Sequence, residues 1–316
     1  MGERIYEQDT VCLAKVETSY GVDAEPTAAA SAMRVKVDAN LLDGDSEEMS
    51  FDAGRGGSKG SIQRNRRISG TLTGYVAGAG EAGQQPAIAP LLQCAGLTPT
   101  IVTDEGEQKV IYTPVSTGQD SCTLHIFRGK IRHPVLGARA NLEVALGTDA
   151  LPKFTFNNLL GLFMEPEQVA AFQNADFSEF QRPMVTEPAA ITKMELFGQP
   201  VNMSTLTFRL GNTVTYRAVT NDESVQITAR RPQIEIVFEE PMLDDFNWWE
   251  RQSTYGALAY QLGQDAIDTG HILQLDIPNL QLNSITPTIV DGISHLSCVL
   301  DVVPTARDND FELIFR

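Results

Sequence analysis

The sequence predicts a mainly β protein made of two tandem antiparallel units, each a β-sandwich or half-barrel flanked by one α-helix. Short runs in which apolar and polar residues alternate recur along the 316-residue chain and predict a dozen or more strands. Two of these strands open on paired arginines, Arg66-Arg67 and Arg230-Arg231, and Pro114 and Pro278 follow them at the same distance. The chain lacks the regular alternation of strands and helices that a parallel sheet needs. A β-rich unit present twice favours a protein that builds pseudo-symmetric rings.

The order of the predicted strands divides the chain into four parts. They are an N-terminal arm at 1–34, a first β domain at 35–164, a linker with three prolines at 165–190, and a second β domain at 191–316. A chain of this length suits two domains of about 150 residues, each with its own core. Residues 11–16 of the arm alternate and predict a strand, which pairs either within its own domain or with a neighbouring subunit.

Each β domain is expected to carry one helix that ends at a glycine. Residues 87–95 form the first of these helices and end at Gly96. Residues 244–262 form the second, which is the clearest helix of the chain, and end at Gly263. A further short helix is expected in the linker, at 165–173.

A long polar segment, residues 44–67, lies between the predicted strands 35–41 and 68–76. It holds five glycines and few apolar side chains, so on its own it buries too little apolar surface to become ordered. Loops of this length are usually functional or disordered. We therefore interpret the segment as the tip of a long hairpin.

The net charge of the chain argues against a nucleic-acid-binding protein. It has 41 acidic residues against 24 basic ones and a formal net charge of −17, whereas nucleic-acid binding needs basic side chains that neutralise phosphates. No apolar run approaches the roughly 20 residues that span a bilayer, and the polar residues 1–10 predict no secretory signal. The cysteines are far apart and predict reduced, buried thiols: Cys12, Cys94, Cys122 and Cys298.

The sequence offers weak signs of enzymatic or metal chemistry. Gly78–Gly83 matches the Gly-x-Gly-x-x-Gly pattern of dinucleotide-binding loops. The strand before it alternates with Ser and Thr, however, and the helix after it is short and contains prolines, so we interpret it as a flexible crossing loop. The histidines and the acidic run Asp308–Asp310 lack the spacing of zinc or calcium sites. We therefore predict no catalytic residue, no cofactor and no metal.

Several short motifs, taken in their order, resemble one known family. In the first half they are Lys15–Gly21, Gly78–Gly80 and Pro86–Gly96. In the second half they are Leu210–Asn212, Arg230–Pro232, Asp291–Ile293 and Asn309–Leu313. Each motif is short, but in this order they resemble the major tail tube proteins of long-tailed, siphovirus-like bacteriophages, and the likeness extends over most of the chain.

The resemblance implies two packed antiparallel sheets with a flanking helix, and rings that stack into a hollow tube through which the genome passes. Most such proteins carry one tube domain and form hexameric rings. The apparent duplication favours trimeric rings with pseudo-sixfold symmetry. The implied partners are further copies of the chain, a tape measure protein and the tail terminator and tip proteins, and the implied location is the tail of a virion assembled in the host cytoplasm. The alternatives are a β-sandwich adhesin or carbohydrate-binding module and, third, a nucleotide-binding enzyme that uses Gly78–Gly83.

Two sets of residues are expected to act in such a tube. The hairpin tip at 44–65 is expected to make the ring-to-ring contact through charges of both signs: Glu47, Glu48, Asp52, Arg55, Lys59 and Arg64. Alternating strands display every second side chain on one face, which would gather carboxylates along a lumen that DNA passes without specific binding. The candidate lumen carboxylates are Glu143, Glu235 and Asp301.

Overall fold

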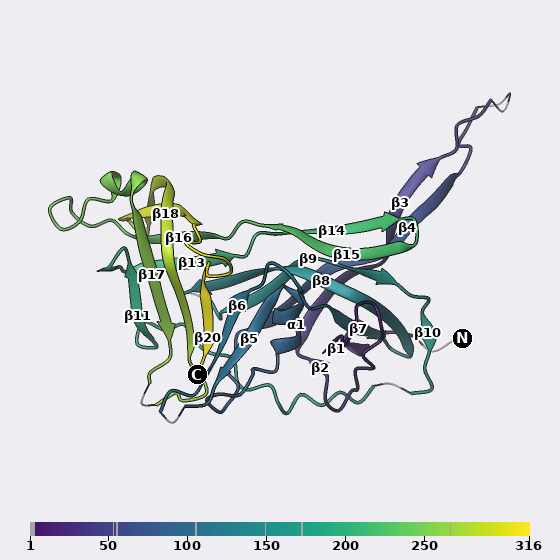
Figure 1. Cartoon of the computed structure of the whole chain (residues 1–316), viewed down its shortest axis with the longest axis horizontal. Helices are drawn as coiled ribbons and strands as arrows, with labels where there is room; N and C mark the ends of the chain where they lie inside the picture. The colour runs from purple at the N-terminus through teal and green to yellow at the C-terminus, as the bar shows by residue number, and fades with distance from the viewer. Residues whose placement is uncertain are drawn as a thin grey trace.

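The computed structural model describes residues 4–52, 54, 56–104, 106–148, 150–171, 173–265 and 267–316. It confirms the mainly β fold, with 54% of residues in strands, 5% in helices and antiparallel sheets. Within the described ranges, α1 (Ala89–Cys94) is the one α-helix, and it confirms the first predicted helix. Figure 1 shows an elongated molecule from which a hairpin projects at one end, while loops close the opposite end.

Six strands of the first half form one antiparallel sheet. Their order across the sheet is β3–β4–β9–β8–β7–β1. The bounds are β1 (Thr10–Val16), β3 (Val35–Glu48), β4 (Ser61–Tyr75), β7 (Cys122–Arg128), β8 (Ile131–Gly147) and β9 (Lys153–Phe163). Period-2 patterning explains these strands. In β9, for example, Phe154 and Phe156 are fully buried while Thr155 between them faces away from the core.

Six strands of the second half form a corresponding sheet. Their order is β13–β16–β19–β18–β17–β11. The bounds are β11 (Ile191–Leu196), β13 (Met203–Arg209), β16 (Gln233–Glu239), β17 (Tyr255–Leu262), β18 (Leu273–Val290) and β19 (Ile293–Val302). When the six strands of each half are counted along the chain, both sheets have the same order: second, third, sixth, fifth, fourth, first.

One strand pairing joins the two sheets edge to edge. The first part of β8 pairs with β7, and its last part, 143–147, pairs with residues 205–209 of β13. The sheet therefore continues from the first half into the second. At the other side, β20 (Glu312–Phe315) pairs with both β18 and β6 (Lys109–Pro114).

The remaining elements are short or lie outside the two six-stranded sheets. They are η1 (Glu7–Asp9), β2 (Ala32–Met33), β5 (Leu97–Val102), β10 (Glu167–Gln168), β12 (Gln199–Pro200), β14 (Asn212–Val219), β15 (Asp222–Arg230) and η2 (Trp248–Ser253). The hairpin β14–β15 is inserted between β13 and β16. It occupies the same place in the second half that the distal part of the β3–β4 hairpin occupies in the first.

The hydrophobic core runs through both halves without a break. Phe315, near the C-terminus, packs edge-on against Tyr112, with 5.8 Å between ring centroids, and lies 6.4 Å from Phe154. Phe311 packs against Phe208 of β13 with 4.6 Å between centroids. These rings belong to one cluster of buried residues, so the C-terminal segment ties the halves together. The domain boundaries proposed from the sequence stay predictions.

The helix predicted at 244–262 is wrong. Asn247 caps a short 3₁₀ helix, η2, by accepting a hydrogen bond from the Trp249 N–H at 3.1 Å, and residues 255–262 form strand β17. The strand forms because Leu258, Tyr260 and Leu262 are buried at period 2 beside β18. The second half thus lacks the flanking α-helix that the sequence predicted. In its place, the buried Trp248 packs against Phe238 with ring centroids 4.8 Å apart.

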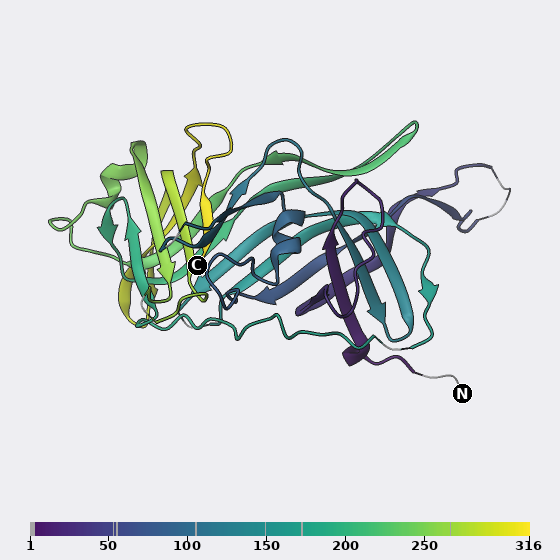
Figure 2. The same ribbon diagram turned by 60° about the horizontal axis from the view of Figure 1, so that its bottom comes forward.

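The linker is extended rather than helical, which corrects the helix expected at 165–173. Within the described part of that segment, β10 pairs with β8, and the Met184 N–H then donates to the Val76 carbonyl at 2.9 Å. Figure 2 shows this segment running along the length of the molecule past both halves. Its own hydrogen bonds therefore go to the body of the protein, for example from the Thr186 hydroxyl to the Ala150 carbonyl at 2.8 Å.

The N-terminal segment belongs to the sheet of its own chain, because β1 pairs with β7 along its whole length. The buried carboxylate of Glu17 fixes the turn that follows. It accepts hydrogen bonds from the backbone N–H groups of Gly21 and Gly137, at 2.8 and 2.7 Å, and from the hydroxyls of Ser121 and Thr123, at 2.5 and 2.9 Å. Four donors satisfy a charge that would otherwise be costly to bury.

Candidate assembly surfaces

The β3–β4 hairpin, residues 35–75, is the most prominent projection of the molecule (Figure 1). From here on, the name arm denotes this hairpin and not the N-terminal residues 1–34. The sequence predicted a long hairpin, but strands replace much of the loop expected at 44–67, since pairing continues as far as Glu48 opposite Ser61. Cross-strand polar contacts explain the extension. Arg64 lies 2.7 Å from Glu47, and Asn65 donates a hydrogen bond to Asp45 at 2.8 Å.

The residues predicted to make ring-to-ring contacts gather on the distal arm. Glu47 and Arg64 form an ion pair with each other, and the Lys59 ammonium lies 5.4 Å from the centre of the Phe51 ring. Glu48 and Asp52 are exposed. Arg55 lies outside the described residues. The arm therefore carries charges of both signs, some of them already paired within it.

The arm also exposes large apolar side chains, which sequence reasoning missed. Four of them are between 38% and 56% exposed: Leu42, Met49, Phe51 and Ile62. Three of these lie in the segment 44–67 that was interpreted as a polar loop, and Leu42 lies just before it. Exposed apolar side chains gathered on a projecting element commonly mark an interaction surface.

The three candidate lumen carboxylates lie on the sheet face that points away from the core. Glu143 and Glu235 converge on one guanidinium, that of Arg209, at 3.3 and 2.6 Å. Asp301 accepts a hydrogen bond from the Gln233 amide at 2.6 Å and lies 3.1 Å from Arg231. The prediction that these carboxylates share one face agrees with the register. It omitted the arginines, which the same period-2 reading of 207–209 and 231–233 would have placed there.

A polar row crosses this face on eight consecutively paired strands. Opposite residues of an antiparallel pair share a face, so the register alone aligns them. None of the eight is buried, and four of them are charged, two positive and two negative. From β3 to β18 the row runs Lys36, Thr73, Thr155, Glu143, Arg209, Gln233, Asp301, Gln281.

The β14–β15 hairpin lies across the first half, on the same side as that row. Arg139 and Asn141 alternate with buried residues of β8 and contact the hairpin: Arg139 donates to the Val225 carbonyl at 2.7 Å, and the Asn141 oxygen accepts from the Asn212 N–H at 2.7 Å. The Arg67 guanidinium of β4 lies 5.5 Å from the Tyr216 ring. An extension of the second half therefore covers part of the first.

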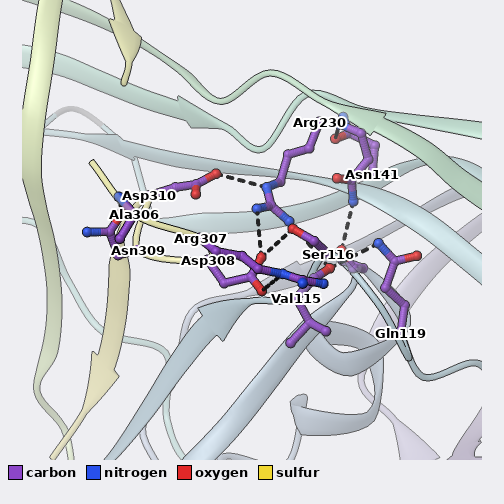
Figure 3. Close-up of polar contacts among 12 residues, drawn as sticks. Val115, Ser116, Gln119, Asn141, Arg230, Ala306, Arg307, Asp308, Asn309 and Asp310 are labelled. Atoms are coloured by element: carbon purple, nitrogen blue, oxygen red, sulfur yellow. Dashed lines mark hydrogen bonds and ion pairs between the residues drawn. The ribbon is translucent and has the colours of Figure 1, made fainter. Parts of the chain in front are cut away.

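A buried ion cluster fixes the base of this hairpin (Figure 3). Arg230, the last residue of β15, donates to Asp310 at 2.9 Å and lies 3.4 Å from Asp308. Ser116 donates to Asp308 as well. Burial acts to raise the pKa of Asp308, but the hydrogen bond from Ser116 and the contacts with Arg230 outweigh it, so that the pKa is lowered. The acidic run that suggested calcium is thus held by an arginine.

The Gly78–Gly83 loop makes a close backbone crossing. The Gly80 N–H donates to the Gly270 carbonyl at 2.9 Å, and a Cβ on Gly78 would lie 2.1 Å from that same carbonyl oxygen. Gly78 and Gly80 are thus explained by contact with another loop of the chain. The helix that follows is only six residues long. The antiparallel strands around it also differ from the parallel arrangement in which dinucleotides bind.

The described residues contain no group of three or more His, Cys, Asp or Glu side chains that could hold a metal ion. The four cysteines are buried, as predicted, and are free of disulfide bonds. Burial raises the pKa of the Cys12 and Cys298 thiols to about 12. Thiols of this kind are poor nucleophiles at neutral pH.

Comparison with known proteins adds no family to these observations. No protein-family model matches the chain, and no curated protein matches it significantly. In the part of the chain that the structure describes, no helix is long and apolar enough to cross a membrane.

Proposed function

We propose that the chain is a structural virion protein that assembles into stacked rings and forms the hollow tail tube of a long-tailed bacteriophage. The observation that carries the proposal is the edge-to-edge junction of two sheets with the same strand order, through β13 and β8. A wall built from side-by-side copies of one unit needs such a junction, and closing the wall removes exposed strand edges. The resemblance found in the sequence motifs points to the same function.

The shared strand order supports a duplicated tube domain, and hence rings of three chains with pseudo-sixfold symmetry. Negative-stain microscopy of the purified protein tests for tubes, and native mass measurement of a ring counts its chains. Three copies of the 34.5 kDa chain are expected. Six copies would contradict the duplication. A single chain at every concentration, retaining a bound sugar, would instead indicate a carbohydrate-binding module.

The distal arm supplies the proposed contact between successive rings. Deletion of 50–60 is expected to leave a folded protein that forms no tubes. A sharper test is the charge swap Glu47→Arg with Arg64→Glu, which preserves the ion pair within the arm but inverts the charges shown to a neighbour. The swap is expected to shorten or abolish tubes. Tubes of normal length from both variants would exclude the arm as the ring-to-ring contact.

The polar face with Glu143, Glu235 and Asp301 is the proposed lumen surface, which DNA passes without binding. The net charge of −17 predicts that the chain repels DNA overall, and pairing with Arg209 and Arg231 moderates this repulsion at the polar face. Filter binding of duplex DNA at physiological salt is expected to show no saturable binding to the protein. Micromolar affinity that falls steeply with added salt would contradict the proposal. The tape measure, terminator and tip proteins are the proposed partners, in the tail of the virion.

A further inference from the structure

The junction inside the chain provides a template for a junction between chains. At this junction β13 contributes the strand that is second in its half, and β8 contributes the last residues of the strand that is fifth in its half. The other second strand is β3 and the other fifth strand is β18. Over the described residues 35–41, β3 pairs with β4 alone, and residues 282–290 of β18 pair with β19 alone. The two unpaired edges are thus the counterparts of the two paired ones.

The two fifth strands correspond residue by residue. β8 shows a register shift opposite Cys122 and Leu124 of β7, and β18 shows the same shift opposite Gly256 and Leu258 of β17. Further along, one core-facing row in each half fixes the alignment. In the first half the row is Val37, Leu72, Phe156, Leu142, and in the second half it is Leu206, Ile236, Cys298, Ile285.

This alignment identifies the residue of β18 that corresponds to the contact in β8. Leu146, four residues after Leu142, pairs with Leu206 of β13, and both are buried. Ile289, four residues after Ile285, occupies the corresponding place in β18. It is 77% exposed, while Leu146 is 0% exposed. The difference arises because β13 covers Leu146 and nothing described in the chain covers Ile289.

The two unpaired edges lie apart on the molecule: Figure 1 shows β18 at the left, whereas β3 starts near the middle and runs to the right. A contact between them joins different surfaces of the two copies, which is the arrangement that generates rings or filaments rather than isolated pairs. Further apolar side chains follow Glu240, whose N–H donates to the Ser294 carbonyl beside the β18–β19 turn at 3.0 Å. Met242 and Leu243 are 77% and 63% exposed.

We propose that β3 of one copy adds to β18 of the next copy as an antiparallel strand, with Val37 opposite Ile289. The register of β13 on β8 then places Lys36 opposite Val290 and Asn40 opposite Thr286. This inference rests on the proposed ring assembly and names the surfaces that join its chains. Pro287 lies within the β18 segment and lacks an N–H, which limits indiscriminate pairing of the free edge before assembly.

Cysteine cross-linking in assembled particles tests the register. Lys36→Cys with Val290→Cys places thiols on two facing residues of the proposed junction. The control Thr205→Cys with Gly147→Cys places them on the corresponding pair within one chain. Under mild oxidation the control is expected to form a disulfide inside the chain, and the test pair a ladder of multiples of 34.5 kDa on non-reducing gels. Lys36→Cys with Ile289→Cys, which face opposite sides of the sheet, is expected to give no ladder.

The outcomes separate this inference from the proposed function. Tubes that form while the control cross-links and the test pair does not would overturn the register and leave the tube standing. A chain that stays single at every concentration would overturn both. As a second measurement, Ile289→Asp is expected to keep the unfolding midpoint of the isolated chain and to lose assembly. Wild-type assembly by this variant would overturn the proposed contact.

Discussion

Replacement of Arg230 by Met is expected to destabilise the protein strongly, because it leaves a buried carboxylate without its cation. The side chain of Asp310 is 5% exposed, and its ion-pair partner is the Arg230 Nε at 2.9 Å. Arg230 itself is 14% exposed and also contacts Asp308. Water therefore has little access to the carboxylate that remains after the substitution.

The magnitude follows from the cost of an unpaired buried charge. Removing one partner of a buried ion pair costs about 3–5 kcal/mol, and we expect the lower end because Asp308 keeps the hydrogen bond from Ser116. Replacing both partners, Arg230→Met with Asp310→Leu, removes the stranded charge. The double variant is therefore expected to lose less stability than Arg230→Met alone.

Urea denaturation followed by tryptophan fluorescence measures the effect, because the buried Trp248 packs in the core of the second half. The matched control is Arg217→Met in the same hairpin. Arg217 pairs with Asp222 at 2.9 Å, but both side chains are 50% exposed. An exposed pair contributes at most about 1 kcal/mol. Equal losses in Arg230→Met and Arg217→Met, or a double variant less stable than Arg230→Met, would refute the reasoning.

Three further outcomes are expected. The pKa of Asp308 is lowered in the folded protein, so its contribution to stability is present above the ordinary carboxyl pKa of about 3.9 and is lost as pH falls through the lowered value. Asp308→Asn should therefore flatten the acid limb of a curve of stability against pH. An unchanged acid limb would contradict this. Leu146→Ala should cost the isolated chain about 2–5 kcal/mol in urea titrations, whereas Ile289→Ala at the corresponding exposed position should cost almost nothing, and equal costs would show that the two sites are not distinguished by burial. A thiol reagent at neutral pH should label none of the cysteines until the protein unfolds, and rapid labelling of the native chain would contradict their burial: Cys12, Cys94, Cys122 and Cys298.

Local sequence patterns predicted most strands but gave a wrong helix at 244–262. Alternation located β9 and β16 because their buried side chains recur at period 2, and β3 because partly buried and exposed side chains alternate along its first half. The helix expected at 244–262 combined residues of different elements, since Phe246 precedes η2, Trp249 lies in η2 and Tyr260 belongs to β17. Gly263 ends that strand rather than a helix. Single-sequence spacing does not show which neighbour a residue will pack against, and pairing with β18 decided the outcome.

The candidate surfaces were predictable only in part, for the same reason. The sequence predicted a projecting hairpin at 44–65, because its glycines and charges exclude a core position. It did not predict that Glu47 would pair with Arg64, or that Arg209 would join Glu143 to Glu235, because those contacts depend on register between distant strands. The sequence could not predict that the side chain of Ile289 would be exposed. An apolar residue in an alternating strand looks the same whether or not a neighbouring strand covers it.

The pairing of β13 with β8 has a consequence for how accurately a ring can form. A ring closes only if the rotation from each unit to the next is a whole fraction of a full turn. In a ring of three such chains, half of the junctions are set during folding, inside a single polypeptide and independently of concentration. Only the other half must be found by diffusion. Misplaced or missing units can then arise at half as many assembly steps. The junction within each folded chain also sets the angle between neighbouring units, and hence the curvature of the wall.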